Sequence, residues 1–408
     1  MIGAMQDWSL RVSSIIDHAA KYHANRAVRG RSAEGPIVES TWGEVRERAL
    51  KCAQGLVKLG LKPGDAVGVM AWNTPRHMEV WYGVSGANCI LHTLNPRLFE
   101  EQLDYIINHA DDQAIMVDAD LVPVIERLLP KLTGVKHYII LTDRAHMPET
   151  KLPGAICYED WMAEQDGDFA WVPGEERDPC GLCYTSGTTG NPKGVLYEHR
   201  SNVLHSLYAS TVDCLGLSSR DVIMPVVPLF HANGWGLAYA APMAGASMVM
   251  PGRDMSAPAL YEMLEQGVTV TAAVPTIWLA MLQHLRASDL TFSTLKRTVI
   301  GGSSCPKAVI EAFQKEHGVF VIHAWGMTET SPLGTVCTFT PEVDGLDEDA
   351  KLEMQTTVGH PPYGVDLRIT DDDGREIGWG SGEQGKLWIR GPGIIKRYHN
   401  KDEDAVVD

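Results

Sequence analysis

The chain has 408 residues, of which 44% are hydrophobic and 21% charged, as in a globular protein of two or three domains, and its formal net charge is −17. The acidic excess argues against a nucleic acid or an anionic membrane as partner, because both favour basic surfaces. The sequence has no integral membrane segment, and residues 1–30 lack the apolar core of a signal peptide, so we expect a cytoplasmic protein.

The first part of the chain alternates helix and strand patterns. Thr41 and Glu44 have the spacing of a capping box, and apolar residues then recur at helical spacing until Gly60. Ala66–Ala71 is typical of a buried strand, and Pro75 of a helix start. Further strand-like runs lie at 89–91, 114–117 and 138–141. This alternation predicts layered α/β sheets whose strands are mostly parallel.

Residues 184–194 read Y-T-S-G-T-T-G-N-P-K-G and follow the apolar stretch 181–183. Glycines let backbone N–H groups approach an anion, hydroxyls add donors, and Lys193 adds a positive charge, so a phosphate-binding loop is predicted. Asn191 and Pro192 separate the last loop glycine from the lysine, which excludes a Walker motif. The alternative is a flexible linker, which the strand-like run 195–197 argues against. The candidate nucleotide-binding residues here are Thr185, Ser186, Gly187, Thr188, Thr189, Gly190 and Lys193.

Just before this loop, Cys180 and Cys183 form a C-x-x-C pair. Such a pair could be half of a zinc site or a redox centre, but a second ligand pair at suitable spacing is not evident. We therefore interpret both cysteines as core residues of a strand. Free thiols are consistent with a reducing compartment.

Residues 228–235 read P-L-F-H-A-N-G-W, which places His231 and Trp235 in a largely apolar stretch. A histidine in an apolar stretch is commonly structural. Trp235 could equally be a core aromatic residue.

Two further motifs follow. Residues 301–306 read G-G-S-S-C-P after the apolar Val299-Ile300, which predicts a tight turn before a helix that begins near Pro306. Residues 324–330 read A-W-G-M-T-E-T. There Trp325 offers a flat face for adenine, Thr328 a donor for a phosphate and Glu329 an oxygen ligand for Mg²⁺. Read alone, the same residues fit core packing and an ordinary helix start.

The C-terminal part has β character. The alternation of Leu387 and Ile389 with polar neighbours predicts a half-buried strand, and the run D-D-D-G at 371–374 predicts a hairpin. Residues 358–361 read V-G-H-P, 385–391 read G-K-L-W-I-R-G, and 397–400 read R-Y-H-N.

From about Thr41 onward these motifs, in this order, resemble the adenylate-forming superfamily, which includes acyl-CoA synthetases, firefly luciferase and the adenylation domains of peptide synthetases. The resemblance implies an α/β fold, the large N-terminal domain of such an enzyme, with layered sheets and a smaller β-rich subdomain. The expected divisions are 1–200, 201–340 and 341–408. Lys386 stands where the family usually has Glu, so a role of that acid is not expected here.

The resemblance implies an ATP-dependent, AMP-forming acyl-CoA synthetase that uses ATP, Mg²⁺ and coenzyme A. His231 stands about where amino-acid-activating members have Asp, and a buried ammonium without a partner costs several kcal/mol, so the expected acid is a plain carboxylic acid. Related enzymes place a tryptophan near Trp235 as a gate of the acyl tunnel. A short, medium-chain or fatty acid and a methylthio-substituted propionate are the candidate acids. A luciferase-like monooxygenase and an adenylate-binding module without turnover are the alternatives.

The resemblance also assigns residues to roles. The catalytic residues would be Lys193, Thr328, Glu329 and His231, and the metal ligands Thr185 and Glu329. Beyond the phosphate loop, the nucleotide would contact Gly302, Ser303, Ser304, His323, Ala324, Trp325, Gly326, Met327 and Thr328. The acyl substrate would contact His231, Trp235, Gly302, Gly326, Met327 and Pro332.

The family continues with a Thr-Gly-Asp motif, a hinge and a mobile C-terminal domain that carries a catalytic lysine. None of these follows Asp408, so we expect residues 1–408 to bind nucleotide but to catalyse poorly on their own. A homodimer is a further expectation from the resemblance.

Overall fold

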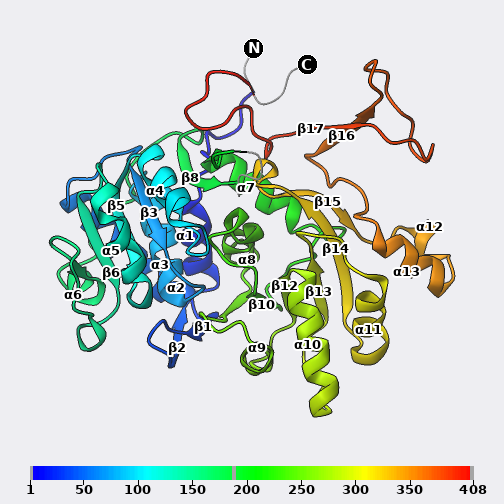
Figure 1. The fold of residues 1–408 in the computed structure, drawn as a ribbon, viewed down its shortest axis with the longest axis horizontal. Coiled ribbons are helices and arrows are strands. Elements are labelled where there is room, and N and C mark those ends of the chain that lie inside the picture. The colour runs from blue at the N-terminus through cyan, green and yellow to red at the C-terminus, as the bar shows by residue number, and fades with distance from the viewer. Residues whose placement is uncertain (1–2, 186–189, 405–408) are drawn as a thin grey trace. The chain divides into compact units, whose positions relative to one another are not determined.

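The computed structural model describes residues 3–185 and 190–404 of the chain. It divides into two compact units, Met1–Val203 and Leu204–Asp408, each with its own sheet and helices (Figure 1). The division predicted from the sequence, at 200 and 340, stays a prediction.

The sheet of the first unit has seven strands in the order β7-β6-β5-β3-β4-β8-β9. All neighbours are parallel except β8 and β9, as expected for strands that alternate with helices. The strands are β3 (Ala66–Met70), β4 (Ile90–Thr93), β5 (Asp112–Asp118), β6 (His137–Leu141), β7 (Ile156–Cys157), β8 (Pro179–Tyr184) and β9 (Gly194–Glu198). An antiparallel pair that does not belong to this sheet, β1 (Ala27–Arg31) and β2 (Ile37–Thr41), precedes these strands along the chain.

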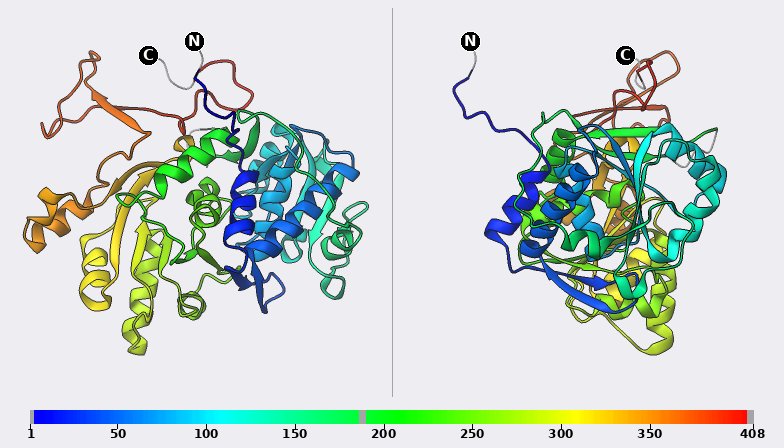
Figure 2. Two further views of the ribbon diagram at one scale, coloured as in Figure 1. Left: turned by 180° about the vertical axis from the view of Figure 1, so that it is seen from behind. Right: turned by 90° about the vertical axis from the view of Figure 1, so that its left-hand side faces the viewer.

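Helices cover this sheet. They are α1 (Ser13–Tyr22), α2 (Trp42–Lys58), α3 (Pro75–Gly86), α4 (Glu100–His109), α5 (Val122–Leu128) and α6 (Tyr158–Ala163). The right-hand view of Figure 2 shows α4 and α5 in cyan on the opposite side of the sheet from α1 and α2 in blue. The predicted start of α2 is confirmed, because the Thr41 hydroxyl accepts the Glu44 N–H at 3.3 Å. Pro75 begins α3, as predicted.

The second unit contains the strand order β15-β14-β13-β12-β10-β11. Neighbours are parallel except β14 and β15. The strands are β10 (Val222–Pro225), β11 (Ser247–Met250), β12 (Val270–Ala273), β13 (Arg297–Ile300), β14 (Phe320–Gly326) and β15 (Leu333–Cys337). The predicted mostly parallel α/β architecture is confirmed in both units.

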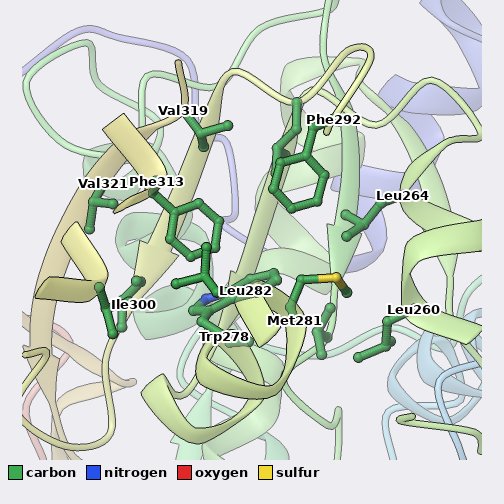
Figure 3. Close-up of a cluster of buried hydrophobic side chains, with 14 of the residues drawn as sticks. Leu260, Leu264, Trp278, Met281, Leu282, Phe292, Ile300, Phe313, Val319 and Val321 are labelled. Atoms are coloured by element: carbon green, nitrogen blue, oxygen red, sulfur yellow. The ribbon is translucent and has the colours of Figure 1, made fainter. Parts of the chain in front are cut away.

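An aromatic core supports the middle strands of this second sheet (Figure 3). Trp278 meets the Phe313 ring edge-on at 5.4 Å, and Phe292 stacks on Phe313 at 6.0 Å. The helices here are α7 (His199–Ala209), which spans the division between the units, α8 (Leu237–Ala244), α9 (Ala257–Leu264), α10 (Pro275–Ser288), α11 (Lys307–His317), α12 (Pro341–Asp344) and α13 (Glu348–Thr356). The apolar cluster joins α9–α11 to β10–β14, which fixes where those strands end.

A small antiparallel sheet of β16 (Asp366–Thr370) and β17 (Lys386–Arg390) follows. Of the hairpin predicted at 371–374, the turn is present, since the Gly374 N–H donates to the Asp371 carbonyl, but only an isolated bridge between Thr370 and Glu376 flanks it. The main partner of β16 is β17. The strand predicted around Leu387 and Ile389 is β17, in which Ile389 is half-buried as expected, whereas Leu387 is 46% exposed because only two strands form this sheet.

Cys180 and Cys183 are both buried within β8, which confirms their interpretation as core residues. All eight cysteines are buried thiols and not disulfides. Within residues 3–185 and 190–404, His, Cys, Asp and Glu side chains form no group of three that could hold a metal. In the same described ranges, no helix combines the length and apolar content needed to cross a membrane.

Candidate active site

Two hairpins carry the two main motifs. In each unit the last parallel strand turns back into an antiparallel edge strand, β8 into β9 and β14 into β15. The connections are residues 185–193 in the first unit and 327–332 in the second. The carboxyl ends of parallel strands are where open α/β sheets bind ligands. Both motifs therefore lie where a ligand is expected.

The base of the first hairpin is closed by main-chain contacts. Tyr184 pairs with Gly194, the Thr185 N–H donates to the Lys193 carbonyl at 2.9 Å, and the Lys193 N–H donates to the Thr185 hydroxyl at 3.2 Å. The Lys193 side chain and Gly190 are exposed. The other predicted phosphate contacts, Ser186, Gly187, Thr188 and Thr189, lie outside the described residues. The hairpin base thus presents a lysine to solvent at the edge of the sheet.

Tyr184 anchors this base, which the sequence did not predict. Its hydroxyl lies 2.7 Å from Nδ1 of His109 in α4, and its ring lies 5.1 Å from that of His92. His92 in turn contacts the Asp112 carboxylate at 2.9 Å, with both side chains fully buried. Burial raises the pKa of the Tyr184 phenol, so it stays protonated and can donate to His109. A polar chain therefore ties the hairpin base to α4 and β5.

The glycine-rich turn follows β13 at the same edge as the second hairpin. Pro306 is the N-cap of α11, which confirms the predicted helix start. The predicted nucleotide contacts on this turn, Gly302, Ser303 and Ser304, are exposed. This turn therefore has three residues open to a ligand.

His323 holds that turn from β14. Its Nε2 accepts the Cys305 N–H at 3.3 Å, and its Nδ1 donates to the Gln355 carbonyl at 3.0 Å, an assignment that follows from the fixed roles of those backbone groups. The side chain is 1% exposed. A direct contact of His323 with nucleotide stays a prediction, whereas its contact with the turn is observed.

Trp235 lies against the glycine-rich turn. A Cβ built at Gly301 would come 3.2 Å from the Trp235 ring, and one built at Gly302 would come 3.9 Å from it. Any larger residue at either position would meet the indole. The structure thus brings together a predicted acyl-binding residue and the predicted nucleotide turn.

The segment from His231 to Gly236 has an unusual backbone. Five consecutive residues, Ala232 to Gly236, have φ between 36° and 74°, in the left-handed region. This region costs a non-glycine residue about 1–2 kcal/mol, and such conformations concentrate at functional sites. His231 precedes the run and is exposed, and its contact with an acyl substrate stays a prediction.

The second hairpin is tightly closed. A Cβ at Gly326 would lie 1.9 Å from the Pro332 carbonyl oxygen, which accepts the Met327 N–H at 2.9 Å. The buried Thr330 hydroxyl also accepts the Met327 N–H, at 3.0 Å. The Trp325 ring covers Gly334, whose Cβ would lie 2.4 Å from it. Thr328 and Glu329 therefore lie on a tightly packed, hydrogen-bonded turn.

Ala324 and Met327 complete the predicted set on this hairpin. Ala324 is buried, and a Cβ at Gly301 would lie 2.9 Å from its carbonyl oxygen. Met327 is 43% exposed. Ala324 therefore faces the glycine-rich turn through its main chain.

Glu329 is hydrogen-bonded by two residues from the C-terminal part of the chain. The Tyr398 hydroxyl donates to Glu329 Oε1 at 2.8 Å, and the Ile395 N–H donates to the Glu329 carbonyl at 3.0 Å. Burial, with Glu329 adding to it, raises the pKa of Tyr398 to about 12, so the phenol is a donor at neutral pH. Mg²⁺ is commonly held by one or two carboxylates together with substrate phosphates, and a single carboxylate such as Glu329 fits that pattern.

His205 in α7 makes a further contact that the sequence did not predict. Its Nε2 accepts the Leu333 N–H at 3.3 Å, and a Cβ at Gly236 would lie 2.7 Å from its ring. Burial lowers the pKa of His205 to about 3, which keeps the ring neutral and able to accept. It therefore links the left-handed segment to the second hairpin. Neither His205 nor its helix belongs to a recognisable motif.

Comparison with known proteins identifies relatives over the whole chain. The chain is 43% identical over 408 residues to a 3-methylmercaptopropionyl-CoA ligase of Ruegeria pomeroyi, covering all of this chain and 76% of that protein. It is 42% identical over 408 residues to a medium-chain-fatty-acid–CoA ligase of Ectopseudomonas oleovorans, covering all of this chain and 75% of that protein. A solved long-chain-fatty-acid-CoA ligase from Archaeoglobus fulgidus superposes with a TM-score of 0.82 at 25% identity, covering 98% of this chain and 79% of that one.

The model of one protein family, described as AMP-binding enzyme, matches residues 16–399. That range contains the phosphate-loop hairpin, the glycine-rich turn and the Glu329 hairpin. With this match and the relatives above, the chain belongs to the AMP-binding enzyme family.

Proposed function

We propose that the protein is an ATP-dependent, AMP-forming acyl-CoA synthetase. The observation that carries the proposal is the packing of Trp235 against Gly301 and Gly302, next to the strand that ends in the Glu329 hairpin. Candidate acyl-binding and nucleotide-binding residues thus share one edge of one sheet. Its relatives named as CoA ligases support the same class of reaction.

The proposed reaction has two steps. A carboxylate oxygen of the acid attacks the α-phosphorus of ATP, so that an acyl-AMP forms and pyrophosphate leaves. The thiol of coenzyme A then attacks the acyl carbon, the thioester forms and AMP leaves. Such chemistry needs positioning and charge stabilisation more than covalent help from the protein.

Particular residues would serve these steps. Lys193 and the hydroxyls of residues 185–189 would hold the terminal phosphates, and Thr328 the α-phosphate. Bound Mg²⁺ would neutralise phosphate charge, with Glu329 and Thr185 as the proposed protein ligands. Trp325 and the exposed Gly302-Ser303-Ser304 turn would hold the adenosine.

The acid is proposed to be a plain carboxylic acid of medium chain length or a methylthio-substituted propionate. No carboxylate stands at position 231 to pair with an ammonium group, and the indole of Trp235 offers an apolar wall. The names of two relatives point to the same two acids. Mg²⁺ as the metal, a homodimer and a cytoplasmic location belong to this proposal as well.

The experiment supplies the full-length enzyme with ATP, Mg²⁺, coenzyme A and a panel of acids from butanoate to dodecanoate, including 3-methylthiopropionate. We expect thioester and AMP in equal amounts without any need for oxygen. An oxygen-dependent product would instead indicate a monooxygenase, and ATP binding without AMP release with every acid would indicate a binding module.

The Trp235→Ala variant tests the acyl assignment in the same assay. It should favour bulkier acids and leave the KM for ATP nearly unchanged, because one methylene in an apolar pocket is worth about 1–3 kcal/mol. An unchanged acid profile with a lower melting temperature would assign Trp235 to the core alone.

A further inference from the structure

The segment that follows β17 contacts the second hairpin at three places. The Ile395 N–H donates to the Glu329 carbonyl at 3.0 Å, the Tyr398 hydroxyl donates to Glu329 Oε1 at 2.8 Å, and the Ser331 hydroxyl donates to the Gly393 carbonyl at 2.6 Å. The main chain and the side chain of Glu329 are thus both bound by residues 393–398. The sequence analysis predicts no site residue in this segment.

We propose that Tyr398 is a positioning residue for Glu329 and thereby for the bound cation. This inference rests on the proposed role of Glu329 as a Mg²⁺ ligand. A carboxylate on a free side chain can rotate, so a cation must order it when it binds. The phenol fixes one oxygen, Oε1, and leaves the other oxygen of the same carboxylate in a defined place for the cation.

The chemistry of the two partners supports this assignment. A phenol donates one hydrogen bond and carries no charge, so it orients the carboxylate without cancelling the charge that attracts the cation. A lysine at that position would compete with the metal. Groups that hydrogen-bond to a metal ligand typically change metal affinity or activity by about 10- to 100-fold when they are removed.

Residues 393–398 also lie against α7 and the second hairpin through Gly393. The Tyr208 hydroxyl of α7 lies 2.8 Å from where a Cβ of Gly393 would stand, and Ser331 binds the same residue. Residues 393–398 are therefore seated against α7 and the hairpin, which holds Tyr398 in reach of Glu329. A loss of the phenol should then alter the metal site without detaching the segment.

The test compares Tyr398→Phe with a matched Tyr363→Phe control, whose side chain is 96% exposed. Two quantities are measured in the full-length enzyme: the Mg²⁺ concentration that gives half-maximal pyrophosphate release at saturating ATP, and Mn²⁺ binding to the enzyme–ATP complex by water-proton relaxation. For Tyr398→Phe we expect both constants to weaken about tenfold, while the KM for the acid and the melting temperature change little. Tyr363→Phe should match the wild type. Unchanged or tighter cation binding in Tyr398→Phe would overturn the proposal.

A double-mutant comparison tests whether Tyr398 acts through Glu329. In the Glu329→Gln background, Tyr398→Phe should weaken Mn²⁺ binding no further, whereas an additive loss would overturn the proposal. Ser331→Ala weakens the seating of the segment but keeps the phenol, and it should shift the Mg²⁺ constant much less than Tyr398→Phe. If Glu329→Gln itself leaves the Mg²⁺ dependence unchanged, the proposed role of Glu329 fails; if it alters that dependence and Tyr398→Phe does not, only the positioning role fails.

Discussion

The two hairpins share an architecture and differ in what stabilises them. Each joins the last parallel strand of its sheet to an antiparallel edge strand. Among the described residues, the first is closed at its base by two bonds between Thr185 and Lys193, one between main-chain groups and one from the Lys193 N–H to the Thr185 hydroxyl. The second is closed along its length, with Pro332, Thr330 and Met327 bonded to one another. The first thus offers backbone groups and a lysine to a ligand, and the second offers side chains on a fixed support.

Glycine substitutions should separate the two hairpins most clearly. In Gly326→Ala the new Cβ would lie 1.9 Å from the Pro332 carbonyl, a backbone atom that cannot move without opening the hairpin. We expect a loss of about 3 kcal/mol in the free energy of unfolding, at the upper end for overpacking. Thioester formation should fall about a hundredfold, because the neighbouring Thr328 and Glu329 would be displaced.

Gly190→Ala is the matched change in the first hairpin. No described residue lies within 4 Å of its new Cβ, but its φ of 151° disfavours a side chain. We expect a cost of only about 1 kcal/mol in the free energy of unfolding, measured by denaturant titration beside Gly326→Ala. Equal destabilisation by the two substitutions would show that the second hairpin is no more rigidly closed than the first.

The second prediction tests the anchor of the first hairpin. Tyr184→Phe removes the hydroxyl that contacts His109 and keeps the ring, which lies tilted against that of His92. The free energy of unfolding should fall by about 1 kcal/mol, because the partly buried His109 ring loses one hydrogen bond. The KM for ATP should rise several-fold with a smaller change in kcat, since Thr185 follows Tyr184 directly.

Tyr105→Phe is the control for this change, since Tyr105 stacks on His109 with ring centroids 5.1 Å apart and its ring is kept. Its KM for ATP should equal that of the wild type. If Tyr184→Phe also leaves the KM for ATP unchanged and lowers only the melting temperature, the polar chain below the hairpin supports the fold and not the nucleotide site.

The sequence was sufficient to predict several strands and the position of both motifs along the chain, because each depends on residues close together in the chain. The continuous apolar runs at 66–71, 114–117 and 138–141 became β3, β5 and β6, and the polar motifs followed strands as expected. Leu387 shows the limit of sequence patterns. Its alternation with polar neighbours predicts which face of the strand is apolar, but other elements decide whether that face is buried.

The anchors of the site could not be predicted, since their partners lie far away in sequence. Tyr184 and His109 are 75 residues apart, Glu329 and Tyr398 are 69 apart, and His205 and Leu333 are 128 apart. Lone tyrosines and histidines in ordinary helices or loops carry no local pattern that reveals such contacts. Only the packing of the sheets brings these pairs together.

The last prediction concerns acid sensitivity, which should distinguish the second hairpin through His205. Burial lowers the pKa of this residue to about 3, whereas an unfolded histidine has a pKa near 6.5. The unfolded chain therefore takes up the proton first as the pH falls. The stabilising contribution of neutral His205 is fully present above about pH 6.5 and is lost as the pH falls towards 3.

The variant His205→Gln keeps an acceptor for the Leu333 N–H but cannot be protonated. His77 and His199 in the first unit, with pKa values lowered by burial to about 4 and about 3, should keep part of the acid sensitivity in the variant. Between pH 7.5 and 5.5 the wild type should therefore lose about 1 kcal/mol more than His205→Gln, as measured by denaturant unfolding at both pH values. Equal losses would mean that His205 is not held neutral in the folded protein. The His205 ring could then not be the acceptor of the Leu333 N–H.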